Sequence, residues 1–145
     1  MIDLTNKTLG WDDKVAVRLP LVQVAVKDLI EILDGALEQG IGYWVEKTRE
    51  PKYLRAPLFE GSDKLHSYTV SISVKPEDDD EWYTINVNTV RDGLLKALDP
   101  SVKIADRFRA EASAVLTQGL DEADLDADSY DVFVQLGVFG ELVYG

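Results

Sequence analysis

The side chains that could do chemistry in this sequence are mostly carboxylates, and many of them gather in two short stretches. The first stretch is an unbroken acidic run, Glu77, Asp78, Asp79, Asp80 and Glu81. The second alternates carboxylates with small or apolar residues, at Asp124, Asp126 and Asp128. Clustered carboxylates can bind a hard cation, or they can form a solvated charged surface. We predict a solvated hairpin tip for the first stretch. For the second we predict a helix N-terminus, where carboxylates cap free N–H groups and favour the dipole.

The segment that begins at Asp124 resembles the start of a calcium-binding EF-hand loop. Such a loop requires glycine at its sixth position and a bidentate glutamate at its twelfth. Here these positions hold Ser129 and Gln135, so the calcium motif is not met.

Asp131 and Gln135 form a further candidate polar site. They lie four residues apart in an otherwise apolar stretch, so a helix would place them on one face. Because buried polar groups need partners, the pair either makes structural hydrogen bonds to a loop or tail, or shares a ligand. We favour the structural role and leave the second alternative open.

Other reactive centres find little support in the sequence. There is no cysteine and only one histidine, His66, which excludes disulfides, thiolate zinc sites and multi-histidine metal sites. Gly40-Ile41-Gly42 lacks the third glycine of a dinucleotide-binding loop. No spacing singles out a pair of catalytic carboxylates. We therefore predict no catalytic residue, no set of metal ligands and no cofactor.

The overall charge limits the choice of partner. With 27 acidic and 15 basic residues, the formal net charge is −12, which excludes ordinary nucleic-acid binding by phosphate neutralisation. The same charge disfavours anionic membrane surfaces. The first residues show no signal-peptide pattern, and charges interrupt every apolar run before the roughly 20 residues that a membrane span needs. We therefore expect a cytoplasmic protein.

Hydrophobic periodicity predicts the elements that must position these side chains. Apolar residues recur at intervals of three and four over 26–37, which indicates an amphipathic helix that Gly40 can end. Strict alternation over 67–74 predicts a half-buried strand. Further strands are predicted at 14–26, 41–45 and 82–87, and further helices at 88–98, 104–119 and 124–139. The helix over 88–98 has Asn88 or Thr89 as its predicted cap, with Val90, Leu94, Leu95 and Leu98 facing inward.

Residues 46–66 show no clear period and contain a basic cluster, so we predict a long loop there. Residues 1–12 are expected to form a loosely packed N-terminal arm. The 145 residues then form a single α+β domain. We expect a small, mostly antiparallel sheet of about four strands, with three or four helices packed on one face.

Two segments of the chain resemble a known group of proteins. The stretch ALEQGIGYW over 36–44 and the closing QLGVFGELVYG over 135–145 are similar to uncharacterised small acidic proteins of actinobacterial phages and mobile elements. The resemblance also includes the approach from Asp128 to Asp131. It implies an accessory protein of phage type, which would act in the cytoplasm of the host cell, and it transfers no catalytic residue.

These observations lead to one expected function and two alternatives. We expect a non-enzymatic accessory protein that binds a protein partner, such as a basic host protein, through an acidic surface formed by 77–81 and 124–128. The chain could also associate with copies of itself. One alternative is an acidic DNA mimic that inhibits a host nucleic-acid-binding protein. The other is a small hydrolase that uses clustered carboxylates and a hard cation such as Mg²⁺.

Overall fold

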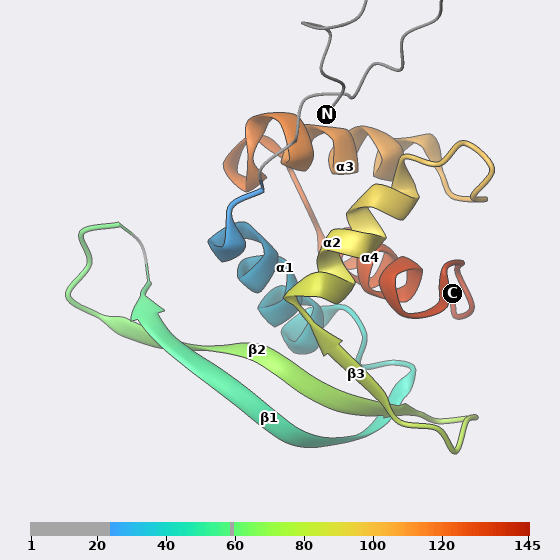
Figure 1. Ribbon diagram of the computed structural model, residues 1–145, viewed down its shortest axis with the longest axis horizontal. Helices are drawn as coiled ribbons and strands as arrows, with labels where there is room; N and C mark the ends of the chain where they lie inside the picture. Colours follow the sequence, from blue (N-terminus) through green and yellow to red (C-terminus); the bar gives the residue numbers. More distant parts are fainter. Residues whose placement is uncertain (1–23, 59) are drawn as a thin grey trace, which may run out of the picture.

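The computed structural model describes residues 24–58 and 60–145 of the chain (Figure 1). The predicted arm over 1–12 and most of the predicted strand over 14–26 lie outside these residues. The elements follow in the order α1 (Val26–Gln39), β1 (Val45–Pro57), β2 (Leu65–Pro76), β3 (Tyr83–Asn86), α2 (Val87–Ala97), α3 (Asp106–Gln118), the short 3-10 helix η1 (Leu120–Glu122) and α4 (Ala127–Phe139).

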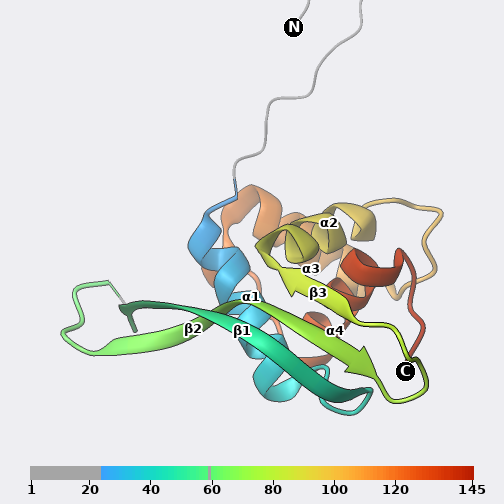
Figure 2. The same ribbon diagram turned by 60° about the horizontal axis from the view of Figure 1, so that its bottom comes forward.

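The described residues form an α+β fold, as predicted. The three strands make one antiparallel sheet in the order β1-β2-β3, and the four α-helices lie on one side of it (Figure 1). The sheet thus has three strands in the described part, against about four expected. The long β1–β2 hairpin extends past the helices (Figure 2), so much of it has no helix covering it.

The prediction of a strand at 41–45 and a loop over 46–66 is wrong. Residues 41–44 form a turn, with the Trp44 N–H donating to the Ile41 carbonyl, and β1 occupies 45–57. Nearly every residue of β1 is exposed on both faces of the sheet, so no apolar alternation marks this strand. It is held by backbone pairing to β2 instead, interrupted by a bulge near Glu50, whose φ is 56°.

Helix α2 begins earlier than predicted and faces differently. Its cap is Asn86, whose side chain accepts from the N–H groups of Asn88 and Thr89 in a capping box. The predicted cap residues are therefore inside the first turn. Val90 and Leu94 are buried as expected, but the inward placement of Leu95 and Leu98 is wrong, since these side chains are 52% and 43% exposed.

Helices α2 and α4 approach each other closely at two glycines, and this contact anchors the core. A Cβ at Gly93 would lie 1.8 Å from the Phe133 carbonyl oxygen, and one at Gly137 would lie 1.9 Å from that of Thr89. Because neither glycine has a side chain, the two backbones can touch. Around them pack fully buried side chains that include Trp44, Phe133, Ile32, Leu33, Ile85 and Leu94.

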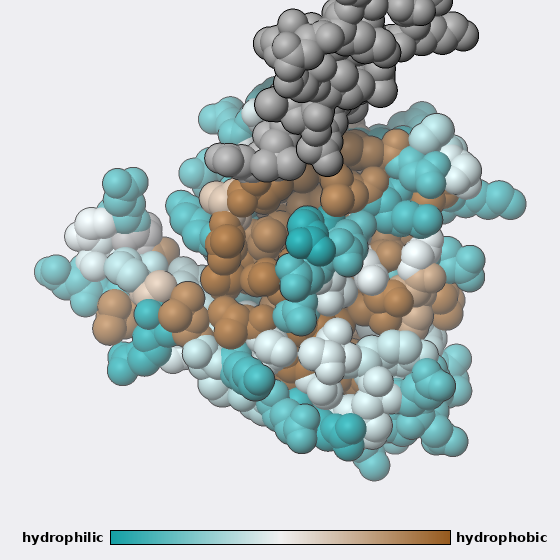
Figure 3. Space-filling view, in the orientation of Figure 1, coloured by the Kyte–Doolittle hydropathy of each residue, from teal (hydrophilic) through white to brown (hydrophobic). Residues whose placement is uncertain are grey.

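A pocket of about 400 Å³ lies between α1 and the far part of the hairpin. Apolar residues from both sides line it, among them Val26, Ile30, Leu54, Pro57 and Tyr68. Figure 3 shows the hydrophobic surface over α1 on this side of the molecule. A pocket at this place means that the far part of the hairpin packs incompletely against α1.

Candidate functional site

The acidic run 77–81 forms the turn between β2 and β3, and hydrogen bonds fix its shape. Asp79 accepts from the Tyr83 hydroxyl at 2.7 Å and from the Glu81 N–H at 2.9 Å. Asp78 accepts from the Tyr144 hydroxyl at 2.6 Å. The hydrogen bond to Asp78 raises the pKa of Tyr144 to about 12, and that to Asp79 raises the pKa of Tyr83 to about 12. These hydrogen bonds hold the Asp78 and Asp79 carboxylates in defined positions.

Gln135 holds the C-terminal segment that meets this turn. Its Oε1 accepts from the backbone N–H groups of Val143 and Tyr144, both at 2.9 Å, and its Nε2 donates to the Tyr144 carbonyl at 3.0 Å. The Tyr144 ring also stacks on Trp44, with ring centroids 5.0 Å apart and planes 5° from parallel. As a result, the segment after α4 has one defined conformation.

Asp131 completes the network from one turn earlier on α4. This buried carboxylate accepts from Trp44 Nε1 at 2.8 Å, from the Tyr43 hydroxyl at 2.6 Å and from Gln135 Nε2 at 2.9 Å. Burial, together with the contact to Asp131, raises the pKa of Tyr43 above its usual range. Asp131 thus joins Gln135 to Tyr43 and Trp44, while Gln135 holds the C-terminal segment.

The second acidic stretch, 124–128, opens α4. Asp126 is the N-cap and accepts from the Ser129 N–H at 3.0 Å, which lowers the pKa of Asp126. Arg107 lies 3.1 Å from Asp126 and 3.5 Å from Asp128, so a cation already balances part of this charge. The turn 77–81 contacts the segment that follows α4, whereas 124–128 lies at the N-terminus of α4. The two acidic stretches therefore belong to different parts of the structure.

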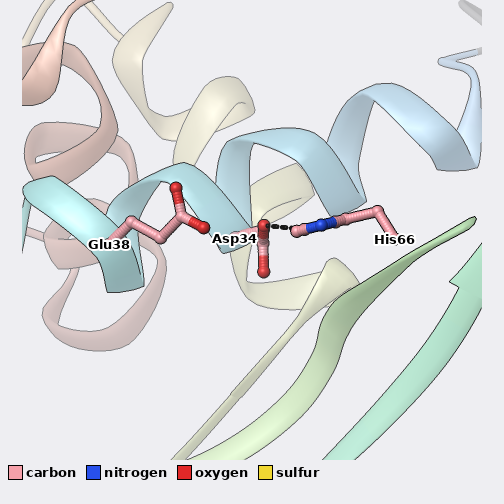
Figure 4. A group of neighbouring side chains, drawn as sticks. All are labelled: Asp34, Glu38 and His66. Atoms are coloured by element: carbon pink, nitrogen blue, oxygen red, sulfur yellow. Dashed lines mark hydrogen bonds and ion pairs between the residues drawn. The ribbon is translucent and has the colours of Figure 1, made fainter. Parts of the chain in front are cut away.

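One cluster of potential metal ligands was missed by the sequence analysis. Asp34 and Glu38 on α1 lie beside His66 on β2, and one ligand atom from each lies within 4.8 Å of the others (Figure 4). The spacing of Asp34 and Glu38, four residues apart on a predicted helix, was the available signal. His66 could not be added to it, because it fell within the predicted loop 46–66 and lies 32 positions from Asp34 along the chain.

Comparisons with known proteins add no family to these observations. No family model, no curated protein and no solved structure matches the chain. Within the described residues, no helix combines the length and the apolar character needed to cross a membrane.

Proposed function

We propose that this chain is a non-enzymatic accessory protein of phage or mobile-element type that binds a basic protein partner in the host cytoplasm. The binding surface is the acidic end, which we define as the turn 77–81 together with the C-terminal segment 141–145. The observation that supports it best is the hydrogen bond from Tyr144 to Asp78, which joins the acidic turn to the segment after α4.

The acidic end has the mixture of side chains that protein interfaces use. Glu77, Asp78, Asp80 and Glu81 are exposed on the turn. In the C-terminal segment, Leu142 and Val143 are 37% and 49% exposed, and Gln135 holds the backbone N–H of Val143. Carboxylates at the rim would steer a basic partner and select it, and the apolar side chains would contribute buried area. A preorganised surface also loses less conformational entropy when it binds.

The second stretch, 124–128, has a lesser role in this proposal. Arg107 contacts two of its carboxylates, and Asp126 is engaged in capping α4. Charges that are already paired attract a partner less strongly than free ones. The exposed acids just before this stretch and at its start supply a comparison within the same molecule.

The test compares two variants that each remove three negative charges. E77Q/D80N/E81Q changes the turn but leaves the tyrosine contacts of Asp78 and Asp79 intact. D121N/E122Q/D124N changes exposed acids before α4. Each protein is immobilised and incubated with actinobacterial lysate at low and high salt. A partner is a protein that is retained in a fixed ratio to the immobilised chain, and its retained amount is measured.

We expect the wild-type chain and the D121N/E122Q/D124N control to retain the same partner, and the turn variant to lose it. Retention should fall as salt rises, because exposed charges are screened. Equal retention by the turn variant would refute the proposal. Displacement of the partner by duplex DNA would instead favour the DNA-mimic alternative, since the two would then compete for one basic groove.

A further inference from the structure

The cluster of Asp34, Glu38 and His66 joins the helical layer to the hairpin. Asp34 and Glu38 are one turn apart on α1, and His66 stands near the start of β2. In Figure 4, Asp34 lies between the other two side chains, and the Glu38 carboxylate and the His66 ring extend toward it from either side. One carboxylate oxygen from each acid and one ring nitrogen lie within 4.8 Å of one another.

Groups outside the cluster hold two of its members in place. The Thr69 N–H donates to Asp34 Oδ1 at 3.1 Å, which leaves Oδ2 directed at His66 Nε2, also at 3.1 Å. The His66 ring packs edge-on against Tyr68, with centroids 4.4 Å apart. Orientation of ligands by hydrogen bonds and packing of this kind is typical of metal centres in proteins.

We propose that Asp34, Glu38 and His66 form a binding site for a divalent transition metal, with Zn²⁺ as its representative. An imidazole nitrogen with two carboxylates suits zinc and its neighbours better than Mg²⁺ or Ca²⁺, which prefer oxygen ligands alone. Two ligands at about 2.0–2.1 Å from a tetrahedral ion are about 3.4 Å apart. The 3.1 Å between Asp34 and His66 is close to that separation.

Metal binding replaces one existing contact and needs little movement. In the metal-free site, His66 Nε2 must carry a proton in order to donate to Asp34 Oδ2. When the metal binds, this proton leaves Nε2, the neutral ring is protonated on Nδ1, and the Nε2 lone pair binds the ion. Its contact with Asp34 Oδ2 is then replaced by two bonds to the ion. Glu38 is exposed and can rotate to become the third ligand. The fourth position remains open to water, because His66 is itself 35% exposed.

A bound ion would fasten the hairpin to α1 beside the pocket, where the two pack incompletely. This role does not depend on the acidic end and stands apart from the proposed function. The ion would be bound by two ligands from α1 and one from β2, and it would thereby crosslink the helical layer and the hairpin.

The test uses the full chain without a histidine tag. Because His66 is the only histidine among the 145 residues, the NMR signals of histidine rings report on this site alone. ZnCl₂ is titrated while these signals and the heat of binding are followed. E38Q removes a ligand from an exposed position, and E31Q is its matched control, a glutamate on the same helix that lies outside the cluster.

We expect the His66 ring signals to shift and to saturate at one equivalent of Zn²⁺. E38Q should weaken the affinity by about tenfold or more, while E31Q leaves it within about twofold. H66Q should abolish binding at one equivalent. Ring signals that stay unchanged at one equivalent would overturn the proposal, as would equal affinities for E38Q and E31Q.

Discussion

Gly93→Ala should be among the most damaging small substitutions in this protein, because it adds a methyl group where two helix backbones touch. The new Cβ would lie 1.8 Å from the Phe133 carbonyl oxygen, whereas real Cβ contacts do not fall below 3.0 Å. Since the obstructing atom belongs to backbone, no side-chain rotation can relieve the clash. Helices α2 and α4 must therefore move apart by about 1.2 Å.

The cost follows from this separation. Overpacking of a core costs about 1–3 kcal/mol and sometimes more, and this clash belongs at the upper end of the range. Alanine is favoured over glycine inside a helix by about 1 kcal/mol, which offsets part of the loss. The free energy of unfolding should therefore fall by about 2 kcal/mol or more.

Urea denaturation followed by circular dichroism measures this change. Gly42→Ala is the matched control, since a Cβ at Gly42 would meet nothing within 4 Å. We expect that control to stay within about 0.5 kcal/mol of the wild-type chain, as is usual for surface substitutions. A G93A variant as stable as G42A would refute the close approach of α2 and α4.

Three further predictions concern the polar contacts. Gln135→Ala should lower the free energy of unfolding by about 2–3 kcal/mol, because two N–H groups and a buried carboxylate lose a partner. Hydrogen exchange at the amides of Val143 and Tyr144 should accelerate, and unchanged exchange would contradict this role of Gln135. Asp126→Ala should cost about 1 kcal/mol at neutral pH. The pKa of Asp126 is lowered in the folded state, so its contribution is present above the unfolded value of about 3.9 and is lost as the pH falls through the folded pKa. Urea curves of this variant and the wild type should therefore converge in acid, and a constant gap would count against the cap. Asp78→Asn should return the pKa of Tyr144 from about 12 toward 10, measured by ultraviolet absorbance. If the variant and the wild type instead titrate alike, the contact between Tyr144 and Asp78 does not form in solution.

The sequence was informative where apolar side chains recur at a regular spacing. The amphipathic pattern of 26–37 predicted α1, and the alternation of 67–74 predicted most of β2, although Thr69 and Ser73 on its predicted polar face are also buried. Strand β1 shows no such pattern, since both of its faces are exposed and backbone pairing alone defines it. Hydrophobic periodicity reflects a difference in burial between the faces of an element, so it cannot reveal a strand whose two faces are equally exposed.

The polar contacts were predictable only in part. Asp131 and Gln135 stood out as polar residues in an apolar run, but their partners could not be read from the sequence. Trp44 lies 87 positions from Asp131 along the chain, and only the packing of α4 near the start of β1 brings the two together. The same reason hid His66 from Asp34, 32 positions away.

The outer edge of β1 bears on how the protein behaves at high concentration. Within residues 24–58 and 60–145, β1 is an edge strand, and backbone groups without a partner there could serve as a template on which further chains add strands and aggregate. Several features of this strand oppose such growth: Pro51 has no N–H to donate, the bulge at Glu50 breaks the straight edge, and Lys47, Lys52 and Arg55 repel a second copy of the same strand. These basic residues of β1 are thus placed where insoluble assemblies would begin.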